Sequence, residues 1–360
     1  MTGPLREAIA NSPYWALLAV LVIAPALIQN QYILQVMIFV GIYIMLTLSL
    51  NLLNGYVGLI ALGHAGFYGI GAYASAKFSL ELGFPFLLSL LGSGIVAGIF
   101  GYLLGRPTLR LTGIYLALAT LGFNVVVWLL LLNWMSFTNG PLGIMSIPPP
   151  NIFGYEIETR SDYFYLILTL VVLTLFSMNR LVNSRFGRAL VAIREDELAA
   201  EAIGVDTTRY KVQAFVLSAF YAGIAGSFYA HFVKYISPDS FTHMESFIML
   251  AMLALGGSGN LFGPVVGATI LIVVPEVFRG LLEYRMIIYG SVLVVMMLVR
   301  REGLLGGRDY SLRLRFLDDP EPEYTQGDKF LPDDVGDDVG AGDGDDLEPS
   351  ADPQGAGGRS

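Results

Sequence analysis

The chain has 360 residues, of which 54% are hydrophobic and only 14% are charged, and it contains no cysteine. Soluble domains are typically about 25% charged, so this composition excludes an ordinary soluble protein. The lack of cysteine excludes disulfides, thiolate metal sites and a cysteine nucleophile. The net charge of −9 is misleading, because residues 318–360 hold 14 acidic and 2 basic side chains, which leaves the preceding body mildly basic.

Stretches of about 20 apolar residues recur along the chain, which is typical of membrane-spanning helices. Ten can be marked, and several are short, so we expect tilted, broken or re-entrant segments. The predicted fold class is therefore an all-α integral membrane protein with about ten transmembrane or partly re-entrant helices. The stretches are Tyr14–Ile28, Tyr32–Leu53, Val57–Ser79, Phe84–Leu104, Leu111–Leu132, Tyr163–Met178, Val212–Val233, Ser246–Leu255, Pro264–Phe278 and Met286–Val299.

Basic residues predict the orientation of the spans. With the N-terminus inside, the inside loops and ends hold 14 Lys and Arg residues and the outside ones hold 5. We therefore predict that both termini face the cytoplasm and that Asn133–Arg160 is an external loop. Residues 1–308 form the predicted transmembrane domain. Residues 309–360 form a predicted acidic, disordered cytoplasmic tail, because they contain too few large apolar side chains to offset the entropy of ordering.

The longest charged segment between the apolar stretches is the predicted cytoplasmic loop 179–211, which contains six basic and five acidic residues. Within it, Asp196 is placed to cap the N-terminus of a short helix, Glu197–Ile203, and Gly204 to end it. Such an amphipathic helix can fit a groove on a soluble partner. The alternative is an ordinary positive-inside loop that folds back on the bilayer. The small apolar face of this helix consists of Leu198, Ala199, Ala202 and Ile203.

Residues 54–76 contain six glycines and His64. A helix interior loses about 1 kcal/mol for each Gly relative to Ala, so this run predicts an interrupted or a tightly crossed segment. Interrupted spans often mark binding sites in transporters, while close packing alone is an equally good explanation. His64 either touches the transported solute or is hydrogen-bonded inside the bundle. The candidate translocation path comprises Gly55, His64, Gly66, Tyr73 and Asn124.

Several patterns of enzymes and nucleotide-binding proteins are missing from the sequence. The glycine-rich run Gly256–Pro264 lacks the Lys-Ser/Thr of a phosphate-binding loop, and we interpret it as a tight turn between two spans. The chain has three histidines, and no Ser/His/Asp set or metal-ligand cluster appears in the sequence. We therefore predict no catalytic residue, no metal site, no ATP hydrolysis by this chain and no nucleic-acid partner.

Several motifs resemble those of the LivM-type permease subunits of branched-chain amino acid ABC transporters. The resemblance covers roughly residues 30–305. At Gly58–Ala65 this chain lacks the Gln and the Ser of the family's usual GQ-SLGHA motif. The motifs are GYVGLIALGHAGFYGIGAYASA (Gly55–Ala76), LRLTGIYLALATLGF (Leu109–Phe123), TNGPLGI (Thr138–Ile144), RFGRALVAIREDELAAEAIGVDTTRYKVQAFVLSAFYAGIAGSFYA (Arg185–Ala230) and LALGGSGNLFGPVVGA (Leu253–Ala268).

This resemblance implies a multi-pass plasma-membrane permease subunit of an ATP-driven importer, which moves branched-chain or related amino acids by alternating access. It implies a second permease subunit of similar fold, two ATP-binding cassette subunits that bind ATP and Mg, and an extracytoplasmic substrate-binding protein. The chain itself would hold no cofactor and would lie in the lipid bilayer. A permease for urea or a short amide is the alternative, and an ATP-independent secondary transporter is a weaker one. The residues to which the resemblance assigns coupling to the ATPase subunit are Arg194, Glu195, Asp196, Glu201 and Gly204.

Overall fold

The computed structural model describes residues 30–108, 111, 113–152, 154–277, 290 and 303–305. All of them belong to Met1–Leu312, the first of two compact units into which the chain divides. The expected stretch Tyr14–Ile28 and the tail 309–360 lie outside the described residues, as does Met286–Val299 apart from Gly290.

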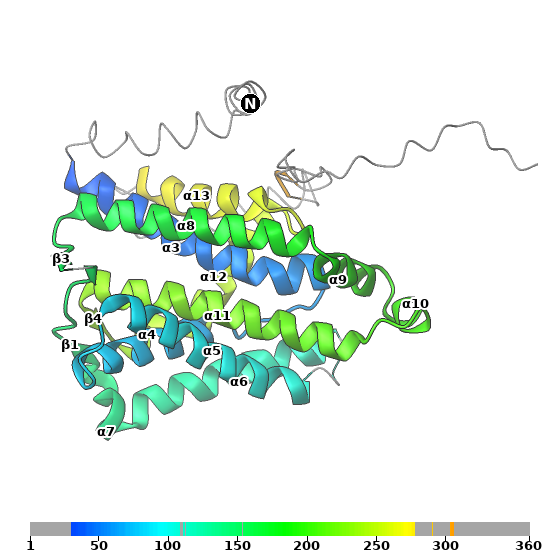
Figure 1. Ribbon diagram of the computed structural model, residues 1–360, viewed down its shortest axis with the longest axis horizontal. Coiled ribbons are helices and arrows are strands. Elements are labelled where there is room, and N and C mark those ends of the chain that lie inside the picture. The colour runs from blue at the N-terminus through cyan, green and yellow to red at the C-terminus, as the bar shows by residue number, and fades with distance from the viewer. Residues whose placement is uncertain are drawn as a thin grey trace, which may run out of the picture. The chain divides into compact units, whose positions relative to one another are not determined.

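Five helices among the described residues are long and apolar enough to cross a membrane, which confirms the predicted all-helical membrane class. The central one is α11 (Thr207–Val233), which packs against the helices α4 (His64–Leu80), α5 (Phe86–Thr108) and α3 (Gln31–Asn51) (Figure 1). Another pair is formed by α3 and α8. The five spans are α3 (Gln31–Asn51) with its π-helical extension η1 (Leu52–Val57), α5 (Phe86–Thr108), α6 (Ile114–Asn133), α8 (Arg160–Val182) and α11 (Thr207–Val233).

Three apolar helices are shorter than the roughly 20 residues of a full span. They are α4 (His64–Leu80), α12 (His243–Gly256) and α13 (Phe262–Val277). The glycine-rich run Gly256–Pro264 forms the turn between α12 and α13, as predicted from the sequence.

The glycine-rich segment is interrupted, as one of the two interpretations predicted. Helix continues through η1 to Val57, Gly58 adopts a φ of +78°, and helix resumes only at His64. The expected stretch Val57–Ser79 is therefore divided, and only the part from His64 onward is one helix.

The same segment also crosses a second helix closely, through glycines on both helices, so the second interpretation holds as well. A Cβ on Gly71 would lie 2.3 Å from the Cα of Gly223, and a Cβ on Gly226 would lie 2.2 Å from the carbonyl oxygen of Tyr68. Since lipid supplies no hydrophobic drive between helices, such backbone approaches are how α4 and α11 pack.

The two ends of the helices differ (Figure 1). At one end, here called the hairpin end, two small antiparallel sheets lie in the connections between helices, among them the predicted external loop Asn133–Arg160. The opposite end, here called the α10 end, holds α9 (Arg185–Glu195) and α10 (Glu197–Ala202). The elements of the hairpin end are α7 (Met135–Thr138), η2 (Gly140–Leu142), β1 (Ile144–Met145) paired with β4 (Tyr235–Ile236), β2 (Asn151–Ile152) paired with β3 (Tyr155–Glu156), and η3 (Pro238–Phe241).

Candidate functional site

The short helix α10 forms where the sequence predicted it. The Asp196 side chain accepts a hydrogen bond from the backbone N–H of Ala199 at 3.0 Å, which satisfies one of the unpaired donors of the first turn. The helix ends at Ala202, one residue before the predicted Ile203. Gly204 follows with a φ of +89°, in the left-handed region where glycine is favoured. Local capping therefore fixes both ends of α10.

The apolar face of α10 points away from the rest of the described structure. Leu198 and Ile203 are each 78% exposed, and Ala199 and Ala202 are exposed as well. Ala200, on the other side, is buried. The helix and its C-cap residue Ile203 therefore leave two large apolar side chains and two small ones uncovered by the described residues.

The acidic side of α10 is fastened to the first turns of α11. The Glu197 carboxylate forms an ion pair with the buried ammonium group of Lys211. The Glu201 carboxylate accepts a hydrogen bond from the Thr207 hydroxyl at 2.7 Å. The structure thus turns the carboxylate of Glu201, a predicted coupling residue, toward α11.

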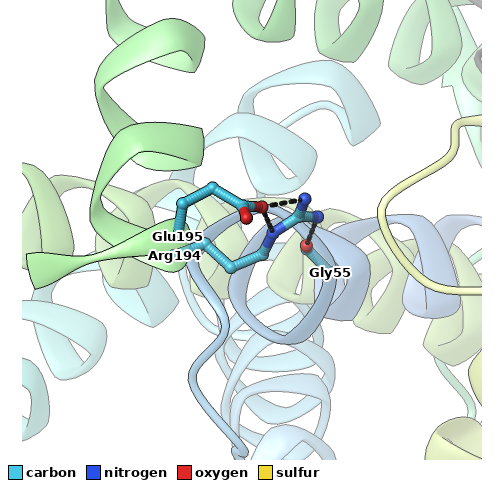
Figure 2. Close-up of polar contacts among 3 residues, drawn as sticks. All are labelled: Gly55, Arg194 and Glu195. Carbon is cyan, nitrogen blue, oxygen red and sulfur yellow. Dashed lines mark hydrogen bonds and ion pairs between the residues drawn. The ribbon is translucent and has the colours of Figure 1, made fainter.

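Arg194 joins the two groups of residues that the sequence analysis kept separate (Figure 2). Its Nη1 donates to the backbone carbonyl of Gly55, a predicted path residue, at 2.9 Å. Its Nε and Nη2 donate to one carboxylate oxygen of Glu195 at 3.1 and 2.7 Å. A predicted coupling residue is therefore bonded to the end of the interrupted helix.

The carbonyl of Gly55 is available because it lies in the last turn of η1. The last four carbonyl groups of a helix lack partners within the helix. A cation at this end also interacts favourably with the helix dipole, typically by about 0.3–1 kcal/mol. Glycine is required at this position, since a Cβ on Gly55 would lie 2.0 Å from Asn51 Oδ1 and 2.4 Å from the nitrogen of Gly259.

The turn between α12 and α13 meets the same helix end through two asparagines that the sequence analysis missed. Asn51 Oδ1 accepts from the N–H of Gly259 at 2.9 Å, and Asn51 Nδ2 donates to the carbonyl of Asn260 at 2.9 Å. Asn260 Oδ1 in turn accepts from the N–H of Phe262 at 2.9 Å, at the start of α13. Asn51 lies inside the apolar stretch Tyr32–Leu53, and a polar amide in such a stretch could have marked it as a candidate site residue.

Two of the predicted path residues meet where α4 packs on α6. Asn124 is fully buried, and neither its amide nitrogen nor its amide oxygen has a hydrogen-bond partner among the described residues. A Cβ on Gly66 would lie 3.1 Å from the Asn124 oxygen. We call this contact between α4 and α6 the α4–α6 seam.

Two further path residues, His64 and Tyr73, are also buried on α4. His64 is buried, and its Nε2 lies 2.7 Å from the hydroxyl of Ser49, which matches the expected hydrogen bond inside the bundle. Tyr73 is buried with its ring edge on Phe241 of η3, and its hydroxyl has no partner in the part of the chain that the structure describes.

A carboxylate that the sequence analysis overlooked also lies within the bundle. The hydroxyl of Tyr43 donates to the Glu245 carboxylate at 2.6 Å, which links α3 to the first turn of α12. Glu245 immediately precedes the expected stretch Ser246–Leu255, so it fell outside the apolar stretches marked in the sequence. Extending the expected stretch by one residue toward the N-terminus would have included the carboxylate of Glu245 and marked it as a candidate.

Comparisons with known proteins agree on one family. The family described as "Branched-chain amino acid transport system / permease component" matches residues 32–299. The high-affinity branched-chain amino acid transport system permease protein LivM of Salmonella typhimurium is 42% identical over 297 residues, which cover 76% of this chain and 70% of that protein. LivH of the same organism is 27% identical over 283 residues, covering 73% and 91%. No solved structure matches the chain.

A more distant relative, the autoinducer 2 import system permease protein LsrC of Salmonella paratyphi B, is 28% identical over 207 residues, or 56% of each chain. These relatives are transport permeases and not enzymes. Since the family match spans most of the chain and the match to LivM covers more than two thirds of both proteins, the chain belongs to the family of permease components of branched-chain amino acid transport systems.

Proposed function

We propose that the chain is one of two membrane-spanning subunits of an ATP-driven importer, which moves branched-chain or related amino acids across the plasma membrane by alternating access. The observation that carries this proposal is the exposed apolar face of α10, with Leu198 and Ile203 each 78% exposed on a helix fastened to α11. Exposed apolar surface on an ordered helix is typical of a docking surface. The docked partner is an ATPase subunit.

The proposed topology has about ten transmembrane or partly re-entrant helices with both termini in the cytoplasm. The excess of Lys and Arg in the inside loops supports this orientation, with 14 inside and 5 outside. The opposite positions of α10 and of the small sheets also support it (Figure 1). Residues 1–308 then form the permease domain, with 179–211 as its cytoplasmic coupling loop. Residues 309–360 form a cytoplasmic tail.

The partners follow from this arrangement. The similarity to both LivM and LivH supports a second permease subunit of similar fold. Two ATP-binding cassette subunits bind ATP and Mg at the α10 end, and this chain holds no cofactor. An extracytoplasmic binding protein delivers the amino acid at the hairpin end, where Leu142 of η2 is 72% exposed.

The mechanism uses the contacts of α10. ATP closes the pair of ATPase subunits, which displaces α10 and, through the Glu197–Lys211 ion pair, the start of α11. Because α11 packs against α4, α5 and α3, its movement shifts these helices relative to one another. Such rocking of packed helices opens the path to one side of the membrane at a time.

The α4–α6 seam is the part of the proposed path with the clearest polar character. An amide buried without a hydrogen bond costs about 1–3 kcal/mol, and a folded chain retains such a group only where something offsets this cost. Asn124 offers both a donor and an acceptor, which suits the charged groups of an amino acid. We propose that the solute meets this amide as it passes.

Substituting Asn124→Leu tests this proposal, because stability and transport should change in opposite directions. Removing an unpaired buried amide should raise the stability by about 1–3 kcal/mol. Uptake should fall through a higher KM. Thr120→Val, one turn away, removes a hydroxyl that accepts from the N–H of Leu62 at 2.9 Å, so it should lower stability instead. Uptake kinetics in liposomes and thermal unfolding in detergent measure both quantities. An unchanged KM in Asn124→Leu contradicts a role in the path.

The proposed function itself is tested by purification from native membranes in mild detergent, followed by reconstitution into liposomes. We expect an ATPase and a second permease to co-purify, and labelled leucine to enter only with ATP and the binding protein. Uptake by the chain alone without ATP would identify a secondary transporter. Uptake that urea inhibits and leucine does not would identify an amide permease.

A further inference from the structure

Arg194 is turned into the protein, although it belongs to the loop that docks the partner. Its side chain is 37% exposed, and its three hydrogen bonds end on Gly55 and Glu195 of the same chain. We infer that Arg194 is a positioning residue, which transmits the displacement of the cytoplasmic loop to the break between η1 and α4. The inference rests on the proposed function, because that function supplies the displacement.

The arginine is held in one orientation. Glu195 engages the Nε and Nη2 edge of the guanidinium group, which leaves Nη1 to the carbonyl of Gly55 (Figure 2). Arginine suits this arrangement because its planar group presents donors along two edges in a fixed geometry. The exposed ion pair with Glu195 therefore orients the side chain, while the bond to Gly55 makes the connection between segments.

Two glycines from distant parts of the chain enclose this side chain. A Cβ on Gly58 would lie 2.8 Å from Arg194 Cγ, and a Cβ on Gly259 would lie 2.8 Å from Arg194 Nη1. Both glycines have left-handed backbone, with φ of +78° and +79°. The break after η1 and the turn between α12 and α13 are thus both shaped around the arginine.

A displacement of α9 consequently reaches the membrane segment along a second route. The first route passes from α10 to α11 through Lys211. The second passes from Arg194 to Gly55, and through the amide of Asn51 to Gly259 and Asn260. This second route acts on residues 58–63, the break between η1 and α4. The backbone can move there without disrupting a helix.

Arg194→Gln in the complete reconstituted complex separates transmission from docking. The complex should still assemble and hydrolyse ATP, because the exposed apolar face of α10 is unchanged. The number of ATP molecules consumed per solute imported should rise about tenfold or more, the factor that corresponds to losing a charge-assisted hydrogen bond. Arg194→Lys should restore this ratio in part, since lysine keeps the charge but not the two-edged fork.

The matched control is Arg188→Gln on the same helix. The side chain of Arg188 is exposed and has no hydrogen bond or ion pair within the described ranges. It should leave the ratio of ATP to solute at the wild-type value. A wild-type ratio in Arg194→Gln overturns the inference, and so does an equal rise in Arg188→Gln. Failure of the proposed function is recognised separately, because wild-type uptake would then not require ATP.

A cysteine pair keeps the inference testable if Arg194→Gln does not assemble. The natural chain has no cysteine, and an ideal Cβ on Gly58 lies 3.6 Å from the Cβ of Arg194, inside the range of about 3.5–4.5 Å found in disulfides. The Gly58→Cys, Arg194→Cys variant is purified oxidised and then reduced. The disulfide should bring the ratio of ATP to solute close to the wild-type value, and reduction of the disulfide should raise this ratio again. Equal ratios of ATP to solute in both forms, with the disulfide confirmed by mass, overturn the inference.

Discussion

Replacing Leu198→Asp and Ile203→Asp together should abolish ATP-driven uptake while the helical bundle remains folded. Each side chain is 78% exposed, so the change removes almost no packing within the described structure. If an ATPase groove covers them, each contributes about 1.5–3 kcal/mol of apolar burial to docking. Losing both should weaken docking by at least about a hundredfold. Co-purification of the ATPase and uptake in liposomes measure the effect.

The control for this prediction places the same charge at the opposite end. Leu142→Asp, where the leucine is 72% exposed at the hairpin end, should leave ATPase co-purification unchanged. Circular dichroism and detergent elution profiles should match the wild type for both variants. Normal ATP-dependent uptake by the double aspartate variant would mean that α10 does not contact the ATPase.

Gly71→Ala should destabilise the chain by up to about 2 kcal/mol, although alanine is the better helix former. The new methyl group would lie 2.3 Å from the Cα and 2.4 Å from the carbonyl oxygen of Gly223. Both atoms are backbone, so they cannot rotate away, and α4 must separate from α11. Overpacking of this kind costs about 1–3 kcal/mol, and the roughly 1 kcal/mol gained in helix propensity offsets only part of this cost. Thermal unfolding in detergent and the yield of assembled complex measure the loss.

Gly122→Ala makes the identical chemical change where no atom lies within 4 Å of the added Cβ. It should be neutral or stabilising by up to about 1 kcal/mol, since only the propensity term remains. If Gly71→Ala unfolded at the same temperature as Gly122→Ala, the crossing of α4 and α11 would not require glycine.

Much of the local structure could be predicted from the sequence, because its causes lie within a few residues. Asp196 and Gly204 define the ends of α10 through a side-chain cap and a left-handed φ, and neither depends on a distant partner. The six glycines of residues 54–76 predicted both the break and the close crossing. Apolar stretches of sufficient length predicted the all-helical membrane class, since an isolated backbone in lipid must satisfy its own hydrogen bonds. The coupling role assigned to α10 and its flanking residues stays a prediction.

Only the tertiary structure decided which residues meet across the bundle. Arg194 and Gly55 are 139 positions apart, and Asn51 and Gly259 are 208 apart. Membrane helices are apolar on all sides, so their sequences do not reveal which face is turned toward a neighbour. Lipid is as apolar as the helix contacts, so burial alone does not select a rotation either. The rotation of each helix follows from where glycine backbones can touch and where buried polar groups find partners. The contact of Arg194 with Gly55 and the burial of the Asn124 amide without a partner among the described residues both depend on how distant segments pack, so neither can be deduced from one segment alone.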